Sequence, residues 1–317
     1  MNTEGKPVIA LGMRALVAPL ARRARSLVAA GVYGGTQSHR RSRRERSPGP
    51  PKTSPPQGSS MNGRDHAGLC LAACILLLGA AAPAFTADEP AATPYRPTVS
   101  NPAALSAVGY FEVEAGFQRT DNDDPRRRDS IPVLFKYAFT EKVGLLVGGE
   151  AYVKENSDIT GRASGLGDTN LTLKLYHPVN DTLGLGLETG IKAPTAKDSI
   201  GSGKPDIILN GIISTELSGA TVDVNLGAMR LGAIDPSASR VAYTGAAALS
   251  WPIGERWGVA AEFSGIKQQG VAGNAQFLAA VSHNVAKTVV LDAGMAWGLT
   301  KASIDRAVFA GVTVLLR

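Results

Sequence analysis

A period-two alternation of apolar and polar residues, repeated along residues 105–317, is the feature that most constrains this chain. Between residues 170 and 175, for example, three leucines alternate with Asn170, Thr172 and Lys174. Successive side chains of a β-strand point to opposite faces, so the pattern predicts strands that have one apolar and one polar face. The 36 glycines of the chain also disfavour long helices.

The alternation recurs in twelve segments that are separated by turn or loop signals. The segments are 108–119, 131–140, 143–153, 166–176, 183–193, 205–217, 220–231, 241–250, 257–266, 274–282, 288–298 and 307–316. Their number is even, and the connections after the even-numbered segments are short, whereas most of the others are longer. Bacterial transmembrane barrels share these properties, with short periplasmic turns and longer outer loops.

Segment length separates a membrane barrel from a soluble β-sandwich. A tilted strand of roughly 9–11 residues crosses a membrane, whereas strands of globular proteins average about 5–6 residues. A sandwich also alternates, but it does not need so many long strands of similar length. We therefore expect an all-β fold in which residues 105–317 form a closed antiparallel transmembrane β-barrel of about twelve strands, in the bacterial outer membrane.

The polar half of the alternation then faces the lumen. Glu112, Glu114 and Lys136 belong to this inward set. The other lumen-facing candidates are Glu150, Asp168, Lys174, Glu188, Lys192, Asp206, Asp223, Glu262 and Asp292. Because their charges are mixed, two interpretations stay open: the side chains bind or select a permeant, or they neutralise one another and hold the barrel in shape.

The first 104 residues differ from the rest. Residues 1–60 are a basic, low-complexity leader, with eleven Lys or Arg against two Glu. Residues 61–87 have the pattern of a signal peptide: Arg64, an apolar run and small residues near the expected cleavage site. We interpret Met61 as the true start, the rivals being a disordered extension or a weak twin-arginine signal. Residues 88–104 read as a Pro-rich linker.

Composition excludes several function classes. After residue 60 the chain carries a small net negative charge, so it offers no basic field for nucleic acid. Both cysteines, Cys70 and Cys74, lie in the predicted signal peptide, and two of the four histidines lie in the leader, so we expect no metal site and no cofactor. The acidic stretch 121–129 lacks the glycine and terminal Glu of a calcium loop, and we expect a solvated outer loop that meets lipopolysaccharide.

No catalytic constellation is expected either. Ser282, His283 and Asn284 are the residue types of an outer-membrane phospholipase relay, but neighbours along a strand point to opposite faces and cannot form it. We interpret them as turn residues and predict that the protein is not an enzyme.

Four stretches, residues 95–119, 165–176, 185–195 and 248–265, resemble the MetA-pathway of phenol degradation family of outer-membrane proteins, often labelled simply transporters. Gly-Leu-Gly-Asp at 165–168 and Lys-Ala-Pro-Thr at 192–195 are the most specific matches. The resemblance implies a porin-like barrel that passes small, often aromatic compounds, and it brings no catalytic residues. The chain departs from most outer-membrane barrels in ending on Arg317 instead of Phe, which bears on how the barrel assembly machinery recognises it.

These observations predict a channel or uptake porin for small, aromatic or hydrophobic compounds, whose identity the sequence does not give. The alternative is a non-conducting barrel with a structural or surface-interaction role. Twelve strands fall between the roughly eight that leave a filled core and the roughly 16–18 that leave an open channel. Strand number therefore does not decide between the two.

Overall fold

A computed structural model describes residues 90–317 of the chain, apart from residues 124 and 159–160. All regular elements in these residues are β-strands, and no helix among them is long and apolar enough to cross a membrane. The thirteen strands are β1 (Phe111–Asp121), β2 (Arg127–Ala138), β3 (Val143–Ser157), β4 (Gly161–Gly165), β5 (Thr169–Pro178), β6 (Leu183–Ala193), β7 (Asp206–Leu217), β8 (Ala220–Arg230), β9 (Val241–Ile253), β10 (Trp257–Gln268), β11 (Asn274–Ala286), β12 (Val289–Gly298) and β13 (Arg306–Leu316). The predicted leader 1–60 and signal peptide 61–87 lie outside the described residues.

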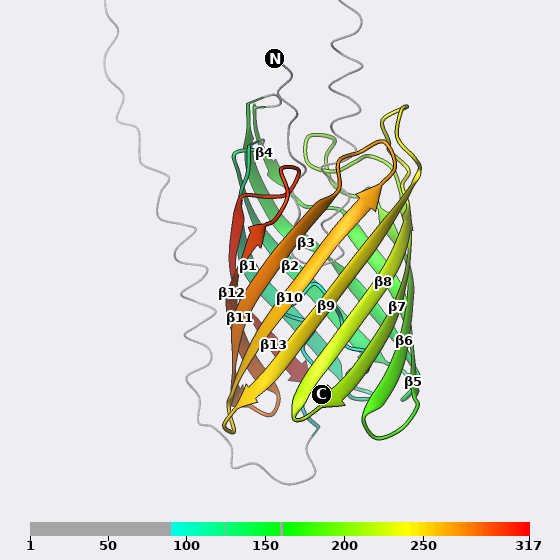
Figure 1. The fold of residues 1–317 in the computed structure, drawn as a ribbon, viewed down its shortest axis with the longest axis vertical. Coiled ribbons are helices and arrows are strands. Elements are labelled where there is room, and N and C mark those ends of the chain that lie inside the picture. The colour runs from blue at the N-terminus through cyan, green and yellow to red at the C-terminus, as the bar shows by residue number, and fades with distance from the viewer. Residues whose placement is uncertain (1–89, 124, 159–160) are drawn as a thin grey trace, which may run out of the picture. The chain divides into compact units, whose positions relative to one another are not determined.

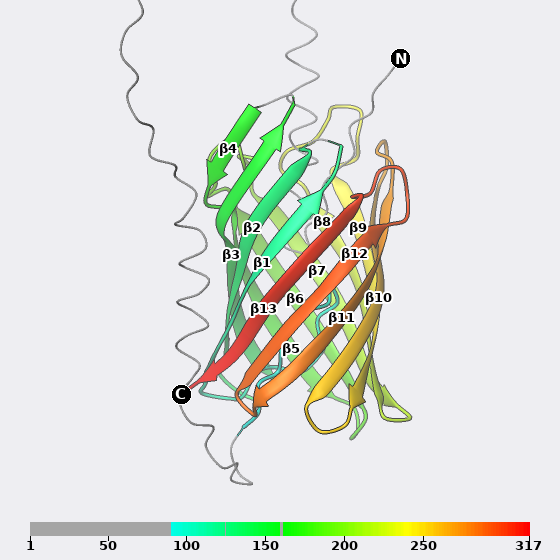
Figure 2. The ribbon, with the colours of Figure 1, turned by 90° about the vertical axis from the view of Figure 1, so that its left-hand side faces the viewer.

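Twelve of these strands form a closed antiparallel barrel (Figures 1 and 2). The barrel closes where β1 pairs with β13, in a register that places Phe111 opposite Leu316. The short β4 pairs only with β3 and adds nothing to the circumference. The predicted twelve-stranded barrel is therefore confirmed, and β4 is an element that the sequence pattern did not reveal.

The two ends of the barrel differ in their connections. At one end, which we call the short-turn end, adjacent strands are joined by a few residues, as at Ser218 and Gly219 between β7 and β8. Both residues have positive φ, 52° and 82°, as a two-residue hairpin turn requires. The barrel also begins at Phe111 and ends at Leu316 here. Short turns identify this end as the periplasmic one.

The outer surface carries the apolar half of the alternation. On β5, Leu171, Leu173 and Leu175 are 52%, 40% and 40% exposed, and the adjacent strand β6 exposes Leu185, Leu187 and Ile191 in the same way. Because every wall strand pairs on both sides, no backbone edge faces the lipid. A closed barrel with an apolar exterior is suited to lipid on its outside, as a membrane-spanning barrel requires.

Aromatic side chains gather near the short-turn end. Tyr137 contacts both Phe111 and Phe139, with ring centroids 4.8 and 5.2 Å away. Trp257 lies 4.3 Å from the ring of His283 on the neighbouring strand. Such positions are typical of the aromatic belts at membrane interfaces. His283 lies inside β11, so our interpretation of it as a turn residue was wrong; the strand continues to Ala286.

A β-bulge in β3 changes which residues face inward. Ile131 pairs with Tyr152 but the next residue, Pro132, pairs with Glu150, which leaves Ala151 as the extra residue. Before the bulge the even-numbered Leu146 is buried, and after it the odd-numbered Val153 is buried. A one-residue shift exchanges the two faces of a strand. This shift places Glu155 in the lumen, which simple alternation does not predict.

Candidate functional site: the barrel lumen

The inward charges predicted from the sequence form three separate ion-paired groups. In the first, Lys136 Nζ lies 2.7 Å from Glu112 and 2.6 Å from Glu114. Next to it, Lys174 pairs with Glu188 at 3.3 Å. All five side chains are at least 95% buried. They come from β1, β2, β5 and β6, whose polar faces the barrel turns toward one another.

The second group joins the two family-specific motifs. Lys192 Nζ contacts Asp206 at 2.7 Å and Asp168 at 3.3 Å, and it donates a hydrogen bond to Ser202. Asp168 also accepts a hydrogen bond from the backbone of Ala196. Because β5 and β6 pair with Asn170 opposite Lys192, the Gly-Leu-Gly-Asp and Lys-Ala-Pro-Thr stretches meet here. Together the two stretches hold the β6–β7 connection against the wall.

The third group contains a residue that sequence analysis did not assign to the lumen. Arg128 forms a bidentate pair with Glu150, with one contact of 2.6 Å, and lies 3.4 Å from Glu155. The acidic stretch 121–129 was predicted to be a solvated outer loop, but β2 begins at Arg127 and turns Arg128 inward. The bulge in β3 turns Glu155, the second carboxylate beside Arg128, toward the lumen. The sequence of β2 or of β3 alone therefore did not indicate this group.

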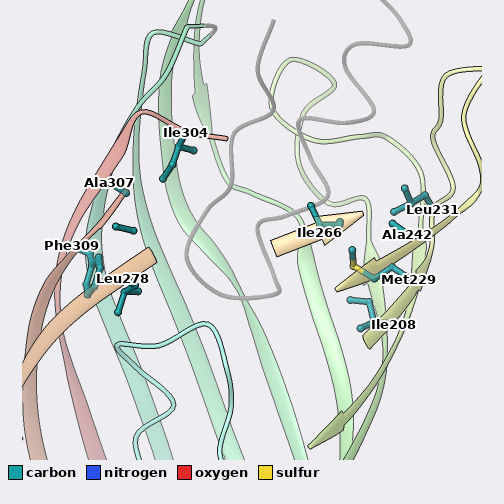
Figure 3. Packing of buried hydrophobic residues seen from close by; sticks show 10 residues of the cluster. Ile208, Met229, Leu231, Ala242, Ile266, Leu278, Ile304, Ala307 and Phe309 are labelled. Atoms are coloured by element: carbon teal, nitrogen blue, oxygen red, sulfur yellow. The ribbon is translucent and has the colours of Figure 1, made fainter. Parts of the chain in front are cut away.

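The three remaining candidates, Asp223, Glu262 and Asp292, have partners outside such groups. Asp223 accepts a hydrogen bond from Ser214 on β7. Glu262 and Asp292 bind a segment that precedes the barrel, which we call the lumen segment (residues 93–105). These residues belong to the stretch that we predicted to be a Pro-rich linker. In the structure they lie within the barrel, where Figure 3 shows them as a cyan coil between the walls.

The lumen segment contacts most of the inner circumference. It enters at the short-turn end, where Ala92 donates a backbone hydrogen bond to Lys287 in the β11–β12 turn. Glu262 on β10 then accepts three hydrogen bonds of 2.7–2.8 Å, from the backbone of Val99 and from the backbone and hydroxyl of Ser100. On the far wall, Asn101 donates to Glu188 at 3.0 Å. The segment thus supplies hydrogen-bond donors to buried carboxylates of the wall.

Arg96 fixes the segment to the opposite side of the lumen. Its Nε and Nη2 atoms donate to the two oxygens of Asp292 on β12, at 3.0 and 2.9 Å. The guanidinium lies against Gly116 and Gly311, which face each other on β1 and β13. A Cβ atom on Gly311 would come within 2.4 Å of Arg96 Nε. Two paired glycines therefore make the space that this arginine occupies.

Tyr95 occupies a second position on the wall. Its backbone N–H donates to Glu114 at 2.7 Å, and its hydroxyl donates to the carbonyl of Ala104 at 3.1 Å. Lys136 Nζ and Lys174 Nζ lie over its ring, 3.9 and 4.1 Å from the centroid. Neither Tyr95 nor Arg96 was predicted as a functional residue. Both precede the first strand, and their partners lie up to 196 residues away in the sequence.

We expect Asp292→Asn to loosen the lumen segment, because it removes a charge-assisted bidentate contact worth about 1.5–3 kcal/mol. Hydrogen exchange of the amides of Tyr95 and Arg96, which bind Glu114, should accelerate by roughly tenfold or more. Mass spectrometry of peptides that span 93–105 measures it. Asp121→Asn removes an exposed partner of Arg306 instead and is the matched control. Equal protection in both variants would contradict this role of Arg96.

An apolar cluster lines part of the lumen toward the end opposite the short turns. Inward side chains of β7 to β13 form a buried cluster there, and Figure 3 shows its members on the inner walls. The cluster consists of Ile208, Met229, Leu231, Ala242, Ile266, Leu278, Ala296, Ile304, Ala307 and Phe309. Sequence analysis did not predict this cluster, because the inward face was assigned from the charged residues alone. Two of the ion-paired groups, those of Lys192 and Arg128, lie toward the same end of the barrel, so the lumen there has an apolar side formed by β7 to β13 and a charged side near β2, β3 and β6.

Comparison with known proteins agrees with this architecture. An outer membrane channel from Pseudomonas putida F1 superposes with a TM-score of 0.53 and 15% sequence identity, over 68% of this chain and 98% of that one. The KdgM porin gives 0.45 and 10%, over 64% and 98%. The CymD monoaromatic hydrocarbon channel gives 0.42 and 9%, over 66% and 89%. The first of these structures, with a TM-score above 0.5, has the same fold as this chain.

No curated protein matches the sequence. A family model does match, over residues 95–316, and its description is "Putative MetA-pathway of phenol degradation". The match includes all thirteen strands, and it begins at Tyr95, inside the lumen segment. The lumen segment thus falls almost wholly within the family's common region. The chain belongs to the MetA-pathway of phenol degradation family of outer-membrane β-barrels.

Proposed function

We propose that this protein is an outer-membrane channel for small apolar or aromatic compounds, and that the lumen segment closes it. One observation carries the proposal. The twelve strands complete the wall without the segment, which is held inside by hydrogen bonds and an ion pair. The lumen is occluded by a segment that is not part of the wall, and not by wall side chains. Such a lumen can open without unfolding of the barrel.

The composition of the lumen supports apolar permeants. The cluster around Met229, Leu278 and Phe309 offers an apolar surface toward the outer end. A small apolar solute gains free energy when it leaves water for such a surface, by about 25 cal/mol per Å² buried. A sugar or an ion gains nothing comparable. The family description, with its reference to phenol degradation, is consistent with this class of compound.

The second candidate function is that of a non-conducting structural barrel. It is favoured by the ion pairs of the lumen, since Lys136, Lys174 and Lys192 each neutralise at least one carboxylate of the wall. In that case the charges and the segment together form a permanent core. The two candidates differ in one measurable property, which is conductance after the segment is detached.

The experiment replaces residues 93–104 by a Gly/Ser sequence of equal length and measures single-channel conductance in planar bilayers. We expect the parent to stay mostly closed and the replacement variant to conduct steadily. A heat-modified gel shift, compared with that of the parent, verifies that the variant is folded. A folded variant that does not conduct would refute the channel and establish the structural alternative.

The same variant tests the permeant class. We expect benzyl alcohol to reduce the ion current through the open lumen at concentrations at which glycerol has no effect, because only the aromatic alcohol binds an apolar surface. Equal block by the two alcohols, or none by either, would leave a channel without the proposed preference.

A further inference from the structure

The ring of Tyr95 lies in a binding site built by the barrel wall. Lys136 and Lys174 place their ammonium groups 3.9 and 4.1 Å from the ring centroid. Leu134 and Leu146, on β2 and β3, pack with the ring in one buried cluster. A cation over an aromatic face is attracted by the ring quadrupole, more strongly where water is excluded. The wall thus surrounds the ring with two ammonium groups and two leucine side chains.

The site does not depend on Tyr95 for its shape. Lys136 is held by Glu112 and Glu114, and Lys174 by Glu188, all of which belong to wall strands. Leu134 and Lys136 face inward on the same strand, and Lys136 is paired in register with Leu146. All seven residues belong to the wall, and the backbone of the lumen segment adds contacts, because Lys136 and Lys174 also donate to the carbonyls of Thr93 and Pro102. Removal of the Tyr95 side chain alone therefore leaves these contacts in place. The vacated space would have the size of a phenol ring.

The charges of the site define which phenol it accepts. Three carboxylates surround two ammonium groups, so a further anion would be repelled. A neutral aromatic ring makes both cation–π contacts without this charge repulsion. The hydroxyl of Tyr95 donates to the carbonyl of Ala104 in the lumen segment, so a neutral phenol O–H finds an acceptor here while that part of the segment stays in place.

We propose that this pocket, formed by Leu134, Lys136, Leu146 and Lys174, is a binding site for neutral phenolic solutes, and that Tyr95 is its built-in occupant. A phenol that enters the site displaces Tyr95 and weakens the attachment of the lumen segment. The inference deepens the proposed channel function, since it names a solute that would favour the open state. The pocket itself is a property of the wall and exists whether or not the barrel conducts.

The direct test uses Tyr95→Ala, which empties the pocket. Binding of phenol to the full-length variant in detergent is measured by calorimetry and compared with cyclohexanol, which has a similar size and hydroxyl but no π face. We expect phenol to bind about tenfold more tightly than cyclohexanol, as one or two cation–π contacts provide. Benzoate, the anionic probe, should not bind. Tyr243→Ala, which removes a tyrosine from the lipid-facing surface, should behave like the parent.

A second measurement tests the inference if the Tyr95→Ala variant does not fold. In the parent protein, phenol should accelerate amide hydrogen exchange in residues 93–105, and cyclohexanol at the same concentration should not. The inference is overturned if folded Tyr95→Ala binds phenol and cyclohexanol equally or binds neither. If the Tyr95→Ala variant is unfolded, the inference is overturned when phenol leaves the amide hydrogen exchange of residues 93–105 in the parent unchanged. A variant that binds phenol selectively in a barrel that never conducts would refute the channel but retain the site.

Discussion

Replacing Lys136 by methionine is expected to lower the free energy of unfolding by about 3–5 kcal/mol, the cost of breaking a buried ion pair by removing one partner. Glu112 and Glu114 both contact its ammonium group and are 0% and 2% exposed, so neither can turn to water instead. Folding titrations in urea with lipid vesicles measure the effect, and the gel-shift midpoint on heating should fall with it.

Two further variants identify the cause of that loss. Arg119→Met removes a partner of Asp129, in a pair that is 40% and 23% exposed, and should cost no more than about 1 kcal/mol. Adding Glu112→Gln and Glu114→Gln to Lys136→Met should recover much of the stability, because these two positions then carry no charge that has lost its partner. If the triple variant were as unstable as Lys136→Met alone, packing and not charge would be responsible.

Replacing Leu173 by arginine is expected to destabilise the barrel by about 2–4 kcal/mol, the cost of a cation on the lipid face near the bilayer midplane. Leu173 lies in the middle of β5 and is 40% exposed on the outer surface. Urea titrations of folding into lipid vesicles give the difference directly.

The matched control is the adjacent residue. Thr172 faces the lumen, between Asn170 and Lys174, so Thr172→Arg places the same charge on the polar side of the same strand. We expect a much smaller loss, since the lumen offers carboxylates instead of hydrocarbon. Equal losses in the two variants would mean that the inner and outer faces of β5 had been exchanged.

The sequence was sufficient to predict the wall because the strand pattern is local. Side chains alternate with a period of two, so the apolar residues of a single segment, such as Leu183–Ala193, reveal both the strand and its lipid face. Even the bounds of this strand agree with the predicted segment. Closure also follows, because unpaired strand edges are too costly inside a membrane.

The bulge in β3 marks the limit of local reasoning. Alternation assigns Glu150 to the lumen but cannot place Glu155, because the extra residue at Ala151 reverses the phase between them. Arg128 was missed for a different reason, because residues 121–129 were predicted to be a loop, whereas β2 already begins at Arg127. The inward direction of these residues depends on the pairing of β2 with β3, which neither segment specifies alone.

By itself, the sequence of this protein determined the number of wall strands, their order of short and long connections, and the faces that meet lipid, since all three depend on neighbours within about ten residues. Only the tertiary structure decided what fills the lumen. Tyr95 and Arg96 lie in a Pro-rich stretch typical of a linker, and their partners on β2, β5 and β12 surround them only after the sheet has closed. A buried carboxylate that lacks a partner within the wall binds the donors that the closed barrel places beside it. The sequence around the carboxylate does not indicate those donors, because they lie far away in the chain.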